Sequence, residues 1–227
     1  MLALLWLASW AGVFEEGMRL SQEGRWPEAR AKFALAVEAE PRNALAWKAL
    51  GVAAGKAGDP AEAEEALGQA CRLQPNLEDA CYYHARSLYT LNRFEAALAA
   101  LQRARTVDAR PGRIFVAMGQ AYEALGREAE AEKAFRAALE REDALDEARL
   151  RYGKFLYRAG RMPEAIQVLG DAVAKRENFG EALAELGRVY YQAGRLGEAI
   201  PLLERARALR PDLDWVAVVL ERARRRN

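Results

Sequence analysis

The chain has 227 residues, 52% of them hydrophobic and 30% charged, which is enough apolar material for a folded core. Its 34 basic and 33 acidic residues leave a formal net charge of +1. This balance argues against a nucleic-acid binder, because binding to phosphates needs a basic surplus. Arginine heavily outnumbers lysine and alanine is frequent, a composition typical of a GC-rich bacterial genome.

The amino end is apolar. Residues 1–14, MLALLWLASWAGVF, carry no charged side chain, and Glu15 and Glu16 then end the run. As a helix with a rise of 1.5 Å per residue the run would be about 21 Å long. A membrane span needs about 20 apolar residues, so we expect no integral span here.

Two interpretations of this end stay open. Residues 1–11 resemble the remnant of a secretory signal, with small residues around Ser9 and Ala11, although no basic residue precedes the run. Alternatively, the segment extends the first helix and shields the end of a stack. The repeat described next is complete without residues 1–9, which favours an exported, for example periplasmic, location; under the second interpretation the location is cytoplasmic.

A pattern of 34 residues recurs six times along the rest of the chain. Within it, apolar residues at helical spacing are interrupted by one residue that favours left-handed backbone, and this residue predicts a tight turn between two short helices. The turn residues are Gly24, Gly58, Asn92, Gly126, Gly160 and Gly194.

Three further columns, each made of the equivalent residue from all six repeats, predict close packing of the two helices in each repeat. Small residues let backbones approach, and a large apolar residue fills the space opposite. One alanine column is Ala29, Ala63, Ala97, Ala131, Ala165 and Ala199. The large column is Phe33, Leu67, Leu101, Phe135, Leu169 and Leu203. The first-helix column that it should face is Gly17, Gly51, Ala85, Gly119, Gly153 and Gly187.

These columns set the domain boundaries. We expect an apolar segment at 1–9, one uninterrupted solenoid over 10–213, and a capping helix at 214–227. The six repeats are 10–43, 44–77, 78–111, 112–145, 146–179 and 180–213. The prolines Pro27, Pro60 and Pro163 fall at the start of second helices, where a missing N–H group does no harm.

The repeat resembles that of the tetratricopeptide repeat (TPR) family. The resemblance rests on the 34-residue period, on Trp47, Leu50 and Gly51, and on the closing prolines at 41, 75 and 211. It implies an all-α fold, a right-handed α-solenoid of six helix-turn-helix repeats with a C-terminal capping helix. It also implies a non-catalytic protein that binds other proteins.

No catalytic constellation, cofactor site or metal site is predicted. His84 is the only histidine, and without a second one we expect neither a histidine metal site nor a serine–histidine arrangement. We expect it half-buried and hydrogen-bonded within the stack. Acidic residues are expected on solvated helix faces. The sequence has no phosphate-binding loop, and we predict that the protein is not an enzyme.

The two cysteines are expected to be small buried thiols. Cys71 comes late in one helix and Cys81 early in the next, so antiparallel helices across the turn at Pro75 could bring them together. In an oxidising compartment a disulfide is the alternative.

If the stack curves as the family does, first helices line a concave groove. Aromatic and basic residues interleave on them from the third repeat onward. The candidate peptide-binding residues are Tyr82, Tyr83, Arg86, Tyr89, Arg113, Gln120, Arg151, Lys154, Tyr157, Arg188 and Tyr191. The alternative is a solvated face whose tyrosines pack between neighbouring helices.

The sequence therefore predicts a scaffold or adaptor that binds a peptide segment of acidic character, because basic groups favour carboxylates. The partner is a protein or peptide, with no nucleic acid and no membrane span. A structural alternative is a module that self-associates through its apolar ends, residues 1–14 or the edge formed by Trp215, Val218 and Val219.

Overall fold

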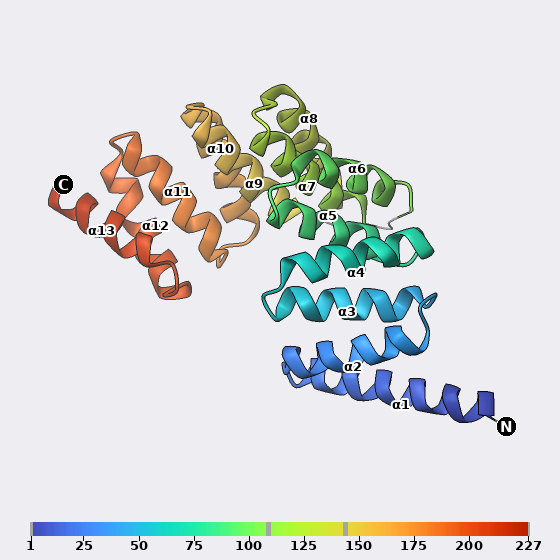
Figure 1. Cartoon of the computed structure of the whole chain (residues 1–227). Coiled ribbons are helices and arrows are strands. Elements are labelled where there is room, and N and C mark those ends of the chain that lie inside the picture. The colour runs from blue at the N-terminus through green and yellow to red at the C-terminus, as the bar shows by residue number, and fades with distance from the viewer. Residues whose placement is uncertain (1, 108–109, 143–144, 227) are drawn as a thin grey trace. The chain divides into compact units, whose positions relative to one another are not determined.

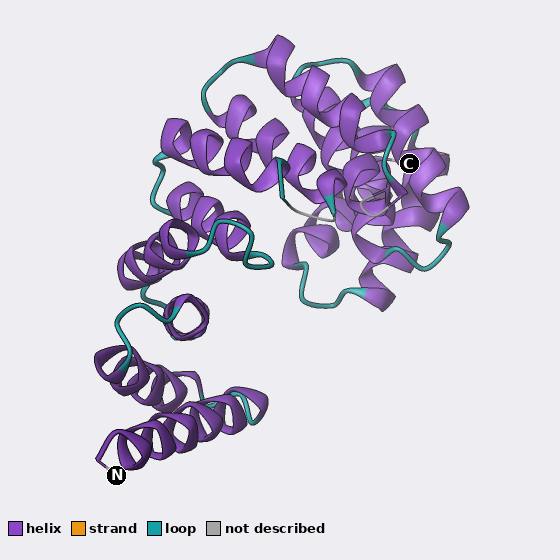
Figure 2. Cartoon of the chain, turned by 90° about the vertical axis from the view of Figure 1, so that its right-hand side faces the viewer, coloured by secondary structure: helices purple, strands orange, loops and turns teal. Residues whose placement is uncertain are grey.

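The computed structural model describes residues 2–107, 110–142 and 145–226, and the side chains from residue 10 onward. The predictions made for the side chains of residues 1–9 lie outside this part. The described residues form helices and the loops between them (Figure 2). None of the described helices is both long enough and apolar enough to cross a membrane.

Thirteen helices are present in the described residues. The prolines Pro27, Pro60 and Pro163 lie in the first turn of second helices, as predicted. The helices are α1 (Leu2–Gln22), α2 (Trp26–Ala39), α3 (Ala44–Lys56), α4 (Pro60–Leu73), α5 (Ala80–Thr90), α6 (Phe94–Arg105), α7 (Pro111–Ala124), α8 (Glu128–Leu139), α9 (Leu145–Arg158), α10 (Met162–Lys175), α11 (Gly180–Gln192), α12 (Leu196–Leu209) and α13 (Asp214–Arg226).

The chain forms two compact units, Met1–Gly126 and Arg127–Asn227. In unit 1, α1/α2, α3/α4 and α5/α6 are antiparallel pairs, each pair packs on the next, and α7 packs on α6 (Figure 1). In unit 2, α8 packs on α9, followed by the pairs α9/α10 and α11/α12 and then α13. The division falls in the turn before α8, inside the predicted repeat 112–145, and one uninterrupted solenoid stays a prediction.

The predicted left-handed turn is present at all six positions, with φ between +56° at Asn92 and +89° at Gly58. The turn at Asn92 shows how the helix is closed: the N–H of Arg93 donates to the C=O of Leu88 at 2.9 Å. This bond satisfies a carbonyl that the helix end leaves without a partner. Asparagine tolerates this backbone region better than other residues with a side chain, which explains why it can replace glycine here.

The first-helix glycines mark the crossing points that the columns predicted. A Cβ added to Gly153 would lie 2.5 Å from Cγ of Leu169, and one added to Gly187 would lie 2.8 Å from Cγ of Leu203. Leu169 and Leu203 are fully buried. In these two pairs of unit 2, the first helix therefore rests its backbone directly on a large side chain of its partner helix.

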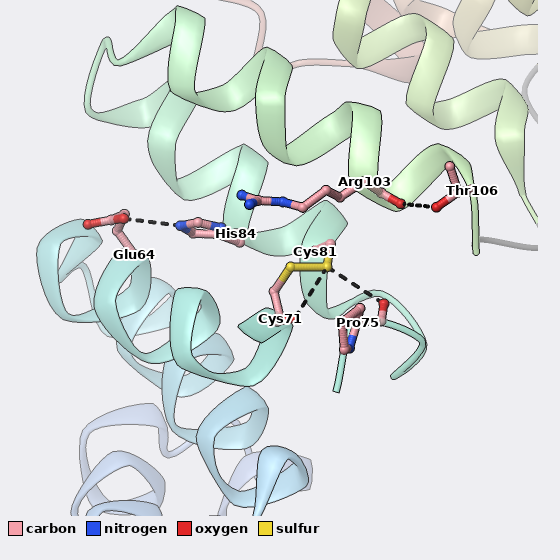
Figure 3. Close-up of a disulfide and its surroundings, with 7 residues drawn as sticks. All are labelled: Glu64, Cys71, Pro75, Cys81, His84, Arg103 and Thr106. Carbon is pink, nitrogen blue, oxygen red and sulfur yellow. Dashed lines mark hydrogen bonds and ion pairs between the residues drawn. A yellow bond between two sulfur atoms is a disulfide. The ribbon is translucent and has the colours of Figure 1, made fainter. Parts of the chain in front are cut away.

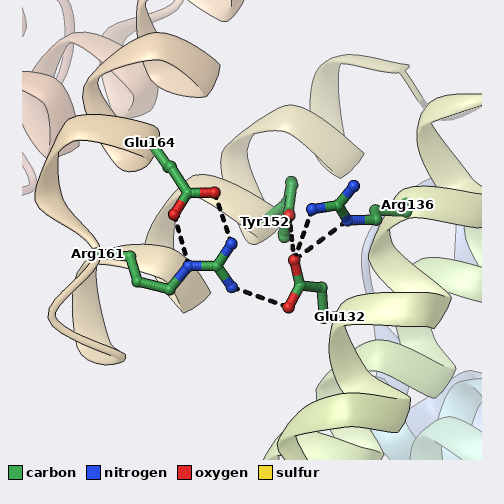
Figure 4. Close-up of polar contacts among 5 residues, drawn as sticks. All are labelled: Glu132, Arg136, Tyr152, Arg161 and Glu164. Carbon is green, nitrogen blue, oxygen red and sulfur yellow. Dashed lines mark hydrogen bonds and ion pairs between the residues drawn. The ribbon is translucent and has the colours of Figure 1, made fainter.

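A polar network holds α8 against α9 and the start of α10 (Figure 4). Glu132 of α8 accepts hydrogen bonds from Arg161 at 2.8 Å, from the Tyr152 hydroxyl at 2.9 Å and from Arg136 at 2.8 Å. The bond from Arg161 is the main reason why the pKa of Glu132 falls to about 2, and burial opposes it. Glu164 also pairs with Arg161.

The prediction of two free thiols is wrong. Cys71 and Cys81 form a disulfide that joins the end of α4 to the start of α5, with their Cα atoms 4.8 Å apart (Figure 3). The loop between the two helices is short and both cysteines point into the helix interface, where they are 4% and 2% exposed.

His84 is hydrogen-bonded within the stack, as predicted, and is more deeply buried than expected, at 7% exposure. Its Nε2 lies 3.0 Å from Oε1 of Glu64 (Figure 3). Glu64 also pairs with Arg93. Burial lowers the pKa of His84, and Glu64 offsets part of that effect.

Candidate functional site

First helices lie on the inner side of each unit. In unit 1, α5 contacts both α3 and α7, and in unit 2, α11 contacts both α9 and α13. Within either unit, no two second helices share contact of that extent in the described residues. Because first helices approach each other more closely, each row of helices curves toward them.

The unit 1 surface, as we call it, consists of Tyr82, Tyr83, Arg86 and Tyr89 on α5 with Arg113 and Gln120 on α7. Tyr82, Arg86 and Tyr89 follow one another at helical spacing and so share a stripe of α5. The rings of Tyr82 and Tyr83 lie 5.7 Å apart, and Tyr89, 37% exposed, packs on Phe94 at 5.1 Å. Across the two helices, the structure brings Arg113 of α7 to Tyr82 of α5.

Arg113 is held in place by Asp79 and Tyr82. Its guanidinium pairs with the Asp79 carboxylate and lies 4.3 Å from the centre of the Tyr82 ring. Asp79 also accepts from Arg110 at 2.7 Å. Burial works to raise the pKa of Asp79, but the hydrogen bonds from Arg113 and Arg110 outweigh it and leave the pKa below its usual value.

Arg86 contributes positive charge to the unit 1 surface. It is exposed, and its guanidinium makes no ion pair among the residues that the structure describes. Lys48 on α3 donates to the backbone carbonyl of Glu78 at 2.7 Å, a neutral acceptor that leaves the lysine charge uncompensated. Among the described residues, Arg86 is therefore the basic member of the unit 1 surface without an ion pair.

The unit 2 surface consists of Arg151, Lys154 and Tyr157 on α9 with Arg188 and Tyr191 on α11. Here the basic groups have acidic partners in the chain itself. Lys154 lies 3.0 Å from Oε1 of Glu185, Arg188 pairs with the other oxygen of Glu185, and Arg151 lies 3.5 Å from Glu147.

Aromatic contacts also organise the unit 2 surface. The guanidinium of Arg188 lies 4.8 Å from the ring centre of Tyr157 and 5.0 Å from that of Trp215 on α13. The ring of Tyr191 lies 5.2 Å from the guanidinium of Arg226. A cation held over an aromatic face is stabilised by the ring quadrupole, so Arg188 has a fixed position.

The expectation that acidic residues lie on solvated faces is wrong for two of them. Glu185 is 6% exposed, and the side chain of Asp79 is 12% exposed. The sequence analysis did not include either acid in the candidate surfaces. Asp79 neutralises Arg113 and Glu185 neutralises Arg188, and both arginines are candidate binding residues. For Glu185 the signal was its position three residues before Arg188, which places both on one helix face.

No group of three or more His, Cys, Asp or Glu side chains in the described part of the chain could hold a metal ion. A pocket of about 200 Å³ lies in unit 1, beneath the loop that joins α4 to α5. Its lining residues are Pro75, Asn76, Leu77, Glu78, Asp79, Cys81, Tyr82, Ala104 and Val107.

The edge proposed for self-association is small. Val218 on α13 is 48% exposed, whereas Trp215 and Val219 are partly buried against the core of unit 2. One exposed valine is ordinary for a monomer surface.

Models of the tetratricopeptide repeat match residues 14–80, 82–147 and 116–178, and another model of this repeat matches 156–219. The chain belongs to the tetratricopeptide repeat family. Proteins of this family are typically scaffolds for protein–protein interaction and are generally not catalytic. A search of curated proteins gives no significant match.

Solved tetratricopeptide-like structures share the fold at low identity. PilW, a type IV pilus biogenesis factor, has a TM-score of 0.79 at 18% identity, over 93% of this chain and 98% of its own. A chain of the APC/C hetero-tetramer Cut9–Hcn1 has a TM-score of 0.73 at 18% identity, over 94% of this chain and 42% of its own. YrrB, described as a TPR protein with an unusual peptide-binding site, has a TM-score of 0.56 at 18% identity, over 83% and 97%.

Proposed function

We propose that this protein is a non-catalytic scaffold or adaptor that holds a peptide segment of a partner protein, of acidic character, against its first helices. One observation carries the proposal. Arg86 is exposed and makes no ion pair among the described residues, and it lies in the same stripe of α5 as Tyr82 and Tyr89.

The chemistry of this stripe supports a peptide ligand. Tyrosine and arginine dominate the binding energy of many protein interfaces, because each offers apolar area and directed hydrogen bonds with few torsions to freeze. A guanidinium binds a carboxylate through two parallel hydrogen bonds. YrrB, whose structure is described as having a peptide-binding site, is a protein of the same fold.

The unit 1 and unit 2 surfaces are expected to contribute differently to peptide binding. In unit 2, Glu185 already neutralises part of the charge of Lys154 and Arg188. A peptide there would be held mainly by aromatic faces such as that of Tyr157. The acidic preference is therefore expected to come from Arg86 and Lys48 in unit 1.

The test is binding to a synthetic peptide library whose acidic, neutral and basic members are matched in length and hydropathy. The variant is Arg86→Glu, and the matched control is Arg105→Glu on α6, the second helix of the same predicted repeat. Arg105 is likewise exposed and makes no ion pair among the described residues. Lys154→Glu is unsuitable, because it would place a second carboxylate beside the buried Glu185.

We expect wild-type protein and Arg105→Glu to prefer acidic members. Arg86→Glu should weaken their binding by at least about tenfold, the effect of losing one well-placed charged contact. Melting temperatures of both variants show whether either change acts through folding. Equal affinities of the two variants for acidic peptides would contradict the proposed surface.

A further inference from the structure

The loop between α4 and α5 contacts the first helices on both sides of α5. The backbone carbonyl of Glu78 accepts a hydrogen bond from Lys48 on α3 at 2.7 Å. The carboxylate of Asp79 pairs with Arg113 on α7, and Arg113 in turn lies over the ring of Tyr82. Two adjacent loop residues thus fix the positions of three side chains on the inner side of unit 1.

This arrangement depends on an uncommon backbone conformation. Asp79 has φ +65° and ψ −9°, in the left-handed region that residues with a side chain rarely adopt. Such a residue keeps its conformation only when its surroundings determine it. Two residues later, Cys81 is covalently tied to Cys71 of α4 (Figure 3).

Much of the loop is exposed, including Pro75, Asn76 and Glu78. The pocket of about 200 Å³ lies directly beneath it and is lined by Pro75 through Asp79. Segments with little packing open locally at low free-energy cost. A covalent link at the end of the loop restricts that opening.

We propose that the Cys71–Cys81 disulfide positions the unit 1 surface, so that the oxidised chain is the form that binds peptide tightly. The disulfide holds residues 75–80 in place, Asp79 then orients Arg113, and Arg113 holds the Tyr82 ring. This inference rests on the proposed function, because it names a feature that controls peptide binding at the same surface. Cys71 and Cys81 are positioning residues that act without touching the ligand.

The first experiment compares the oxidised protein with the protein reduced by dithiothreitol. Reduction transfers two electrons and two protons to the protein disulfide, which becomes two thiols, while dithiothreitol closes to its cyclic disulfide. Amide hydrogen exchange of residues 77–83 reports the loop without any ligand. Affinity is measured with the acidic library peptide that the wild-type protein binds most tightly.

On reduction, we expect exchange in the loop to become about tenfold faster and the affinity to fall by about tenfold, since a flexible site must be ordered on binding. The double variant Cys71→Ser, Cys81→Ser should behave as the reduced protein does and show no response to dithiothreitol. Circular dichroism identifies any general loss of helix in these forms.

A second variant keeps the disulfide. Asp79→Asn retains the shape of the side chain and its tolerance of left-handed backbone, but removes the charge that orients Arg113. We expect it to weaken peptide binding with no change in circular dichroism. The matched control is Asp212→Asn in unit 2, whose carboxylate also pairs with an arginine, Arg210, at the surface.

The outcomes separate this inference from the proposed function. Unchanged loop exchange on reduction, or faster exchange with unchanged affinity, overturns the role of the disulfide while the effect of Arg86→Glu still stands. If Arg86→Glu leaves peptide affinity unchanged, the proposed surface itself fails. If reduction melts the helices, Asp79→Asn decides, and an affinity equal to that of wild type overturns the inference.

Discussion

The carboxylate of Glu185 on α11 lies 3.0 Å from Nζ of Lys154 on α9, although only 6% of Glu185 is exposed. The other oxygen of the same carboxylate pairs with Arg188. One buried acid therefore serves two cations on neighbouring first helices. A buried charge is costly unless it is paired, so the three side chains stabilise the fold as a group.

Removing this acid should destabilise the protein. Glu185→Gln leaves Lys154 and Arg188 near each other, and because their side chains are 26% and 28% exposed, water screens part of the cost. We expect a loss of about 2 kcal/mol in the free energy of unfolding. Glu181→Gln, on the same helix, breaks only the exposed pair with Arg210 and should cost less than about 1 kcal/mol. Urea unfolding that gives equal losses for the two variants would refute the role of Glu185.

Two glycines of unit 2 should respond to alanine in opposite directions. In Gly153→Ala the new Cβ would lie 2.5 Å from Cγ of Leu169, and overpacking of this kind costs about 1–3 kcal/mol. In Gly170→Ala the new Cβ meets nothing within 4 Å, so only the higher helix propensity counts, a gain of up to about 1 kcal/mol. Thermal unfolding checks the signs, and a stabilised Gly153→Ala would mean that the helices do not cross there.

Acid should weaken the network at Glu132. Its pKa is about 2 in the folded protein and 4.5 in the reference state, so the folded protein favours the ionised carboxylate. That stabilisation is fully present above about pH 4.5 and is lost as pH falls from 4.5 toward 2. We expect it to be worth about 1–3 kcal/mol, given the partial exposure of the side chain.

The measurement is the free energy of unfolding between pH 7 and pH 3 for the wild-type protein and Glu132→Gln. The variant should be less stable at neutral pH, and the difference should shrink as the pH falls. A difference that is constant with pH would show that the charge of Glu132 does not contribute.

Loss of the disulfide should lower the free energy of unfolding, in addition to its proposed effect on the position of the loop between α4 and α5. The cysteines are 10 residues apart in sequence, and closing a loop of this length in the unfolded chain is worth about 3 kcal/mol. The double variant Cys71→Ser, Cys81→Ser should show this loss in urea unfolding under oxidising conditions. Under dithiothreitol the wild-type protein should fall to the stability of the variant. A wild-type protein that keeps its advantage when fully reduced would contradict this explanation.

Periodicity and residue type were enough to predict the helix pairs. The turn residues from Gly24 to Gly194 have the left-handed backbone that their spacing indicated, and Gly153 and Gly187 lie where the helices cross. These features are local, or they repeat at a fixed interval, because each repeat packs only on its neighbours. A pattern in one dimension is therefore sufficient to specify them.

The sequence also predicted which helices carry the aromatic and basic residues, but it did not predict the partners of these residues. That Cys71 bonds to Cys81, that Asp79 holds Arg113, and that Glu185 neutralises Lys154 and Arg188 follow from distances between helices. A shift of a few ångströms in helix packing makes or breaks such contacts, since ion pairs and disulfides act only at short range. The sequence alone determined the fold and the helices that carry the candidate residues. The tertiary structure decided which of the basic side chains on those helices have an acidic partner.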